Sequence, residues 1–420
     1  MDCTIDLPKE NSAEEAEFLK FKSKHIPRFP SNLRRIGKER DYIVPRTVAI
    51  GPYYHGVPEL QPMEKVKRLI ANNFFEGLAQ SRDETYEKIK LISRDVRSCY
   101  TDKDALEGIT DDKFAEIMFI DGCFLVQFIE TLLERSGGAS LRSIINPHAN
   151  GVWRDMMLLE NQIPWAVMEI LVQLKSVTME QMLLEDVAAG LHGTPSNIAT
   201  EPLVVDSGTD YKPGHLLCLI RFYEAASKRF TSPSFSSKVV MPVYTSAAEL
   251  AEIGIKLQAN NQKMQISAMN LVKGPLFAKL FLPPLSLDAT IYCWLVNMAA
   301  FEMCTETYLD HDCSVNSYLS LLSQLMNREE DVRELRSKNI LHGPSSDRHT
   351  LEFFNDLAPD LMEGQAYWRL IEVLAEYRQK RWAWIIIYRF LYNNTKTIVA
   401  VLSIIGVLLG IFKALYSLKQ

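Results

Sequence analysis

The chain has 420 residues, of which 47% are hydrophobic and 10% aromatic, a composition that supplies a sizeable core and excludes a disordered chain. The formal charge of -6 is unevenly distributed: residues 378–420 hold seven Lys/Arg and no acid, leaving 39 basic against 52 acidic residues in 1–377. A net charge of -13 on the body disfavours nucleic-acid binding, whereas the basic C-terminal part suits an anionic membrane surface.

The seven cysteines are scattered along the chain without any CxxC pair. The N-terminus lacks the basic region and the apolar run of a secretory signal peptide. We therefore expect reduced cysteines and a body that lies in the cytosol.

The N-terminal part is predicted to be extended. Residues 1–24 form a polar lead-in, with a short helix expected from Ala13 to Lys24. Residues 25–56 contain four prolines and two turn signals, which forbid a long helix. We expect an arm tied onto the body, with a short strand at residues 47–50.

Residues 25–377 are predicted to form one α-rich body. Apolar residues recur at helical spacing in residues 60–80, in residues 83–100 and after Asp111, which is a candidate N-cap together with Asp112. Residues 153–174 are apolar nearly all round, which predicts a central buried helix. Pro164 should kink or break that helix, leaving Glu160, Asn161 and Gln162 to satisfy the freed backbone groups.

The second half combines loops, a sheet and further helices. Residues 187–213 and 231–245 are rich in Gly, Pro, Ser and Thr and are predicted to be exposed loops around a short amphipathic helix. Short alternating runs near 254–287 predict a small antiparallel β element. Helical patterns follow at residues 246–253, 289–307, 315–327, 331–339, 348–357 and 367–392. The predicted fold class is mainly α.

The C-terminal segment has the pattern of a membrane anchor. Residues 397–412 contain no charge and lie between Lys396 and Lys413, and extension to residue 418 reaches the length of a transmembrane helix. Residues 378–396 mix Trp, Tyr and basic residues in the manner of an interfacial belt, and the basic excess on this side favours a cytosolic body. A buried C-terminal core helix is the alternative.

Two groups of residues have the chemistry of a catalytic site. Cys123, with Asp121 and a distant His55 or His215, could form a thiol nucleophile, but a helical cysteine among phenylalanines is more often an inert apolar residue. Glu160, Asn161 and Gln162 could form a polar catalytic cluster, but repair of the helix broken by Pro164 is the favoured interpretation.

Two further groups point to ligands only weakly. Cys304, His311 and Cys313 have a loosely metal-like C-x6-H-x-C spacing, yet a structural zinc site needs four ligands. Residues 53–56 (Tyr-Tyr-His-Gly) could stack on a ligand, but an aromatic turn packed in the core is favoured. GxGxxG, GxxxxGK[ST], HExxH and GxSxG are all absent. The sequence therefore predicts no catalytic residue, no cofactor and no metal.

The ordered set of motifs resembles the plant DUF247 family, also called UPF0481, over residues 25–412. The arm resembles the family's opening I-x-R-V-P, L-R and V-S-I-G-P-x-H-H-G, residues 121–124 its DGCF, and Asp155 with residues 158–164 its D-L-L-L-L-E-N-Q-I-P. Weaker matches continue through residues 215–217, 282–285 and 301–304. Departures from the family pattern are Phe29, Ala49, Tyr54, Val66, Trp165 and Cys218.

The resemblance implies a single-pass membrane protein of land plants without an established catalytic group. Some grass members look like self-incompatibility determinants. We therefore expect a membrane-anchored recognition or signalling protein at the plasma membrane or an endomembrane, which binds unknown protein partners through its surface loops and binds no nucleic acid. The alternatives are an enzyme that acts on a membrane-associated substrate through a non-standard site, and a purely structural anchor.

Overall fold

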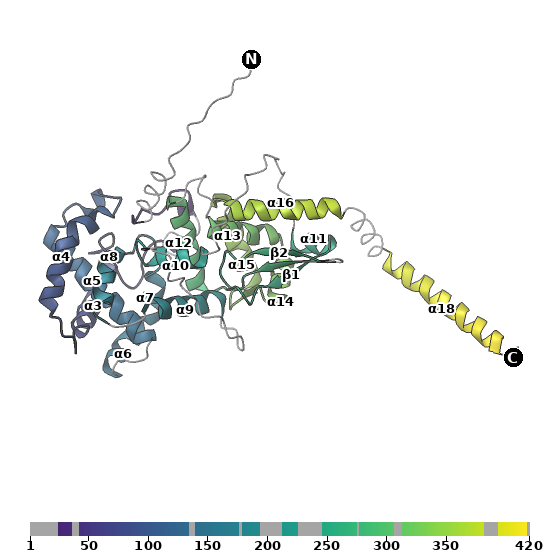
Figure 1. Cartoon of the computed structure of the whole chain (residues 1–420), viewed down its shortest axis with the longest axis horizontal. Helices are drawn as coiled ribbons and strands as arrows, with labels where there is room; N and C mark the ends of the chain where they lie inside the picture. Colours follow the sequence, from purple (N-terminus) through teal and green to yellow (C-terminus); the bar gives the residue numbers. More distant parts are fainter. Residues whose placement is uncertain are drawn as a thin grey trace, which may run out of the picture.

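The computed structural model describes residues 24–35, 42–133, 139–175, 179–193, 212–225, 246–274, 277–305, 313–381 and 394–417. These residues form a mainly helical body with a small mixed sheet, as predicted for the helices (Figure 1). Short 3-10 turns connect several helices, at Leu33–Arg35, Pro58–Leu60, Asp104–Leu106, Asn146–His148 and Ala358–Asp360.

The first half of the body is organised around α5. Its helices are α3 (Gln61–Asn73), α4 (Arg82–Ser98), α5 (Asp111–Leu133), α6 (Ala139–Ile145), α7 (Ala149–Asp155), α8 (Trp165–Val172) and α9 (Met179–His192). Helix α5 contacts α3, α4, α8 and α9, and nearly every side chain from Phe114 to Ile129 is buried. A Cβ at Gly122 would lie 2.6 Å from Leu171 Cδ1, so the glycine permits the close packing of α5 on α8.

The second half is organised around α12. Its helices are α10 (Leu216–Ala225), α11 (Ala247–Glu252), α12 (Ala289–Thr305), α13 (Ser314–Leu325), α14 (Glu329–Ser337), α15 (Asp347–Leu357) and α16 (Gln365–Lys380). Every residue from Ile291 to Phe301 is buried, because α7, α10 and α13 contact this helix from different sides. Helices α5 and α12 are thus the two central helices of the body.

The sheet is mixed, which corrects the predicted antiparallel β element near 254–287. Strands β1 (Ile255–Ala259), β2 (Asn270–Lys273) and β3 (Ala278–Leu282) have the order β1-β3-β2, with β3 parallel to β1 and antiparallel to β2. Residues 263–269, predicted as a strand, form turns and bends that carry the chain past the sheet. This crossover allows β3 to return in parallel beside β1. A second parallel pair joins β4 (Leu285–Ser286) to β5 (Leu341–His342).

The helix predicted at 153–174 is in fact two helices. Helix α7 ends at Asp155 and α8 begins at Trp165, and the buried residues between them are non-helical. Pro164 is the extended N-cap residue of α8, with φ -60° and ψ 140°. The predicted break is therefore confirmed, but it affects nine residues rather than one turn, and we call residues 156–164 the joint.

Other predicted boundaries differ or fall outside the described residues. Residues 47–50 form no strand, and α9 continues to His192, into the predicted loop 187–213. The helix predicted from Ala13 (except Lys24), residues 194–211 and 231–245 of the predicted loops, and residues 382–393 lie outside the described part of the chain.

The C-terminal helix is α18 (Thr395–Ser417). Its described side chains, in residues 399–411, are all exposed. Figure 1 shows α18 as a separate helix at the C-terminal end of the chain. Across the described parts of the chain, none of the helices combines the length and the apolar character that a membrane crossing needs. The transmembrane helix predicted at 397–418 thus stays a prediction.

Candidate functional site: the arm and the joint

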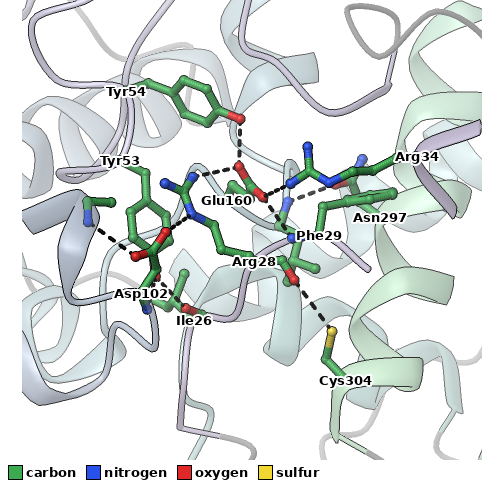
Figure 2. Close-up of polar contacts among 12 residues, drawn as sticks. Ile26, Arg28, Phe29, Arg34, Tyr53, Tyr54, Asp102, Glu160, Asn297 and Cys304 are labelled. Atoms are coloured by element: carbon green, nitrogen blue, oxygen red, sulfur yellow. Dashed lines mark hydrogen bonds and ion pairs between the residues drawn. The ribbon is translucent and has the colours of Figure 1, made fainter. Parts of the chain in front are cut away.

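A polar cluster surrounds Glu160, a candidate residue of the sequence analysis, where the arm (residues 25–56) crosses the joint. Glu160 is 3% exposed and accepts hydrogen bonds from the Phe29 backbone N–H (2.7 Å) and the Tyr54 hydroxyl (2.7 Å). Arg28 Nη1 and Arg34 Nη2 also donate to it, at 2.9 and 3.1 Å (Figure 2). Two guanidinium groups and two further donors thus compensate the desolvation of this carboxylate.

Arg28 extends the cluster to the loop after α4. Its Nε donates to Asp102 at 2.7 Å, and its guanidinium lies 4.0 Å from the centre of the Tyr53 ring (Figure 2). The Tyr53 hydroxyl donates to the Ile26 carbonyl and accepts from the Asp102 N–H. Because the side chains of Arg28 and Asp102 are 34% and 30% exposed, water reaches this outer side of the cluster.

The Tyr54 hydroxyl remains protonated beside Glu160. Burial is the main cause that raises the pKa of Tyr54 far above its usual range, and the negative charge of Glu160 raises it further. The phenol therefore acts as a hydrogen-bond donor to the carboxylate and has no tendency to act as a base.

Asp155 and Asn161 bind the backbone of the next part of the arm. Asp155 Oδ2 accepts the N–H groups of Arg46, Thr47 and Val48, at 2.9, 2.6 and 3.1 Å. Asn161 Oδ1 accepts the Ile50 N–H at 2.7 Å, while its Nδ2 donates to the Val48 carbonyl at 3.1 Å. Side chains thus provide the partners that a neighbouring strand would provide, which explains why residues 47–50 form no strand.

Asp121 of the DGCF motif binds the end of the arm. It accepts the Gly51 N–H at 2.8 Å and Lys67 Nζ at 2.5 Å, and the fully buried Lys67 also donates to the Ala49 carbonyl at 2.8 Å. Burial raises the pKa of Asp121 to about 6, although the Lys67 charge and the Gly51 N–H act in the opposite direction. Gly51 has φ +80°, and a Cβ there would lie 2.5 Å from the Gln162 carbonyl oxygen. This position therefore requires glycine.

Gln162 repairs the backbone of the joint, as predicted. Its Nε2 donates to the carbonyls of Met156 and Leu158, at 2.7 and 2.8 Å. Its Oε1 accepts the Leu217 N–H at the start of α10, at 3.1 Å. The prediction of amide repair is confirmed for Gln162 and also for Asn161, whose Nδ2 donates to the Asp155 carbonyl at 2.9 Å as well as to the arm. Glu160 holds the arm.

Cys123 does not have the surroundings of a nucleophile. Its side chain is fully buried, and burial raises the pKa of the thiol well above its usual range, so the thiol is protonated. Within the described residues, no hydrogen bond joins Cys123 to Asp121, His55 or His215. His215 packs edge-on against Phe301, and burial lowers its pKa to about 3. The structure therefore does not assemble the thiol nucleophile, which was the less favoured interpretation of Cys123.

Of the possible metal ligands, His311 lies outside the described residues, while Cys304 Sγ contacts the Arg28 carbonyl at 3.7 Å. Over the ranges that the structure describes, no group of three or more His, Cys, Asp or Glu side chains is placed to hold a metal. Within the Tyr-Tyr-His-Gly turn, Tyr53 and Tyr54 belong to the polar cluster around Glu160.

Several buried charged residues, which bind the arm or join helices of the second half, were not predicted from the sequence. Lys67 and Asp155 are fully buried, and Arg221 is 7% exposed. The available signal was a charged residue within an apolar helical pattern, as with Asp121 in α5. The local pattern does not indicate the distant partners: Lys67 and Asp121 are 54 residues apart, and Arg28 and Glu160 are 132 residues apart.

The sequence comparisons cover these same elements. The DUF247 family, described as plant protein of unknown function, matches residues 26–409. The UPF0481 protein At3g47200 of Arabidopsis thaliana is 27% identical over 349 residues, which cover 76% of this chain and 69% of that relative.

A second relative aligns over a shorter stretch. The putative UPF0481 protein At3g02645 of the same plant is 32% identical over 162 residues, which cover 36% of this chain and 28% of that relative. No solved structure matches the chain. Because the family match includes the arm, the joint and both central helices, the chain belongs to the DUF247 family of plant proteins.

Proposed function

We propose that this protein is a membrane-tethered recognition or signalling protein without catalytic activity. Its C-terminal segment holds the helical body at the cytosolic face of a plasma membrane or endomembrane, and the body binds protein partners. The observation that carries the proposal is the exposed apolar surface of α18.

The apolar side chains of α18 require a cover that the body does not supply. Nine large hydrophobic side chains between Val399 and Ile411 are 46–64% exposed. The body exposes only four such side chains within its described residues, Leu69, Leu91, Val272 and Phe277. Exposed apolar surface costs about 25 cal/mol per Å², so a helix of this composition favours an apolar environment. These exposures speak against a buried C-terminal core helix.

The charge pattern supports attachment to a membrane. The seven basic residues of 378–420, without any acid, lie on both sides of the apolar run. Basic residues beside an apolar helix bind anionic lipid headgroups, and their excess on the N-terminal side favours a cytosolic body.

The surroundings of the polar residues support a non-catalytic role. Glu160 accepts four hydrogen bonds from the chain itself, and Cys123 is a buried, protonated thiol. A general base or a nucleophile needs a free lone pair that faces a substrate. No observation favours the alternative of an enzyme that acts on a membrane-associated substrate.

Recognition of the self-incompatibility type is the narrower form of this proposal. Its support is the family, some grass members of which look like self-incompatibility determinants, an argument by analogy. The predicted loops 187–213 and 231–245 are the surfaces that we expect to contact partners.

Membrane attachment is tested by comparing the full-length protein, tagged at its N-terminus, with a deletion of residues 397–420 in plant cells. We expect the full-length protein to sediment with membranes after a carbonate wash and the deletion variant to stay in the supernatant. Protease added to sealed membranes should digest the body from the cytosolic side. Equal sedimentation of the two proteins would refute the anchor, and a protected body would refute the orientation.

Partner binding is tested by proximity labelling with the full-length protein in the same cells. We expect a set of proteins that is absent when an unrelated domain replaces the body on the same C-terminal segment. Identical sets for the two proteins would reject recognition by the body and favour a purely structural anchor.

A further inference from the structure

The outer face of the three-stranded sheet combines lysines with exposed apolar side chains. The register places Lys256, Lys279 and Val272 side by side across β1, β3 and β2. Residues two apart in a strand share a face, so Phe277 and Phe281 lie on this same side of β3. We call Lys256, Val272, Phe277, Lys279 and Phe281 the outer face. The opposite face carries Ile255, Leu257, Ala278, Leu280 and Leu282, all buried.

The outer face exposes two large apolar side chains to solvent. Val272 and Phe277 are 47% and 40% exposed, and they are two of the four exposed large hydrophobic residues of the described body. Lys256 Nζ lies 4.3 Å from the centre of the Phe277 ring. Interfacial segments combine Lys or Arg with Trp, Phe or Leu: the apolar side chains enter the boundary between headgroups and acyl chains, and the basic side chains are attracted to anionic lipids.

The charge of this face is opposite to that of the body as a whole. The outer face carries Lys256 and Lys279, and the three strands contain no acidic residue, whereas residues 1–377 have a net charge of -13. Lys273 pairs with Ala278 and therefore lies on the opposite side of β2. The acidic residues nearby lie on the flanking helices: Glu249 and Glu252 on α11, and Glu376 on α16. Glu376 Oε2 lies 4.0 Å from Lys273 Nζ. A small basic surface on an acidic body fits an anionic partner.

The sheet is also close in the chain to the proposed membrane anchor. Helix α16 contacts β2, and only residues 382–393 separate the end of its last turn, Arg381, from Asn394 at the start of α18. This segment spans at most about 45 Å when fully extended. A body attached through α18 therefore holds the sheet within reach of the bilayer surface.

We propose that the outer face of the sheet docks on the anionic headgroup layer of the membrane that holds the C-terminal helix. Lys256 and Lys279 bind lipid phosphate and carboxylate groups, while Val272 and Phe277 enter the interfacial layer. The inference rests on the proposed membrane attachment and adds a second contact, which fixes how the body is oriented on the surface.

The test uses the full-length protein reconstituted into nanodiscs of phosphatidylcholine, with or without phosphatidylserine. Co-elution with the nanodiscs reports the attachment by α18, so its failure would refute the proposed function by itself. Docking is measured separately, as the rate at which an amine-reactive label modifies individual lysines. We expect phosphatidylserine to slow labelling of Lys256 and Lys279 at least about threefold, and high salt to reverse the effect.

Lysines at the other end of the body provide the internal control. Lys65 of α3 and Lys88 of α4 are exposed, and these helices lie at the opposite end from the sheet (Figure 1). Their labelling should not depend on the lipid. Equal labelling of Lys256 and Lys279 in the two lipids, with the protein attached, would overturn docking on anionic lipid. Protection of these lysines by added RNA, without protection by anionic lipid, would also overturn docking on anionic lipid.

A pair of variants separates docking from folding. Val272→Asp places a negative charge on the outer face, and Leu91→Asp places the same charge on α4, where Leu91 is 83% exposed. Both should keep the melting temperature of the parent protein. We expect only Val272→Asp to restore fast labelling of Lys256 and Lys279 in anionic nanodiscs, and protection that survives this change would also overturn the inference.

Discussion

Two buried glutamates hold distant segments together, one in each half of the body. Glu160 of the joint binds the arm through a backbone N–H, a tyrosine and two arginines. Glu302 of α12 binds Arg221 of α10 at 3.0 Å and the N–H groups of Val315 and Asn316, which begin α13, at 3.0 and 2.9 Å.

The two sites differ in how far water reaches the arginines. The side chains of Arg28 and Arg34 are 34% and 37% exposed, whereas that of Arg221 is 8% exposed. Arginines that lose Glu160 can turn to solvent, but Arg221 would keep its charge inside the protein. We therefore expect the arm to open more easily than the core around α12.

The largest expected effect comes from Glu302→Ala. This change removes the acceptor of Arg221 and of two N–H groups in the first turn of α13, so we expect a loss of about 3 to 5 kcal/mol in the free energy of unfolding. Denaturant titration measures it. A loss below about 1 kcal/mol would mean that water reaches Arg221 and would remove the contrast between the two sites.

Glu160→Ala should lower the free energy of unfolding by a smaller amount, about 1 to 3 kcal/mol. The guanidinium groups of Arg28 and Arg34 regain water, while the Phe29 N–H loses its partner. The effect should be local. Limited proteolysis should cut within the arm of this variant faster than in the parent protein, whereas partial unfolding in Glu302→Ala should expose sites in both halves. Cleavage of the two variants at the same sites would contradict the comparison.

A third buried glutamate, Glu224, adds a pH dependence. Its Oε2 lies 3.0 Å from His192 Nε2, and His192 Nδ1 lies 2.7 Å from the Pro284 carbonyl. Burial lowers the pKa of His192, but the charge of Glu224 and the hydrogen bonds to Glu224 and Pro284 together raise it above its usual value. The charged imidazolium can donate to both acceptors, which the neutral ring cannot.

The sign of this effect follows from the raised pKa. A raised folded-state pKa contributes stability that is fully present below the unfolded value of about 6.5 and is lost as the pH rises through the folded value. We therefore expect the stability advantage of the parent protein over His192→Gln to shrink as the pH rises from mildly acidic to alkaline. Melting temperatures measured across this range give the difference, in which other titrating groups cancel. An advantage that grew with pH would contradict the assignment.

The smallest effect is expected for Pro164→Ala, below about 1 kcal/mol. Pro164 lies at the extended N-cap of α8, where alanine can adopt the same backbone angles, and the side chains of Gln162 and Asn161 donate to the carbonyls of Met156 and Asp155. Unfolding in denaturant checks this. A larger loss would show that the proline itself, rather than the side-chain bonds, keeps residues 156–164 non-helical.

Much of the fold was predictable because its signals are local. Apolar residues recur at helical spacing in α3, α4, α5 and α11–α15. Ser81, Ser246 and Ser346 cap their helices by accepting the backbone N–H three residues further along the chain. The predicted break at Pro164 is likewise local. Trp153 begins the run that was predicted to form a central buried helix. It is only partly buried against Trp294, because α7 ends two residues later.

Local sequence patterns predict the helical class, the break at Pro164, the family motifs and the division between an acidic body and a basic C-terminal part. Packing of distant segments determines that Asp121, Asp155 and Glu160 hold the arm, that β3 lies between β1 and β2, and that Glu302 caps α13. The two groups differ in the range of the interactions. Helix periodicity, capping and proline effects act within a few residues, whereas a buried carboxylate is satisfied by whichever donors the packed chain brings to it, up to 132 residues away at Glu160.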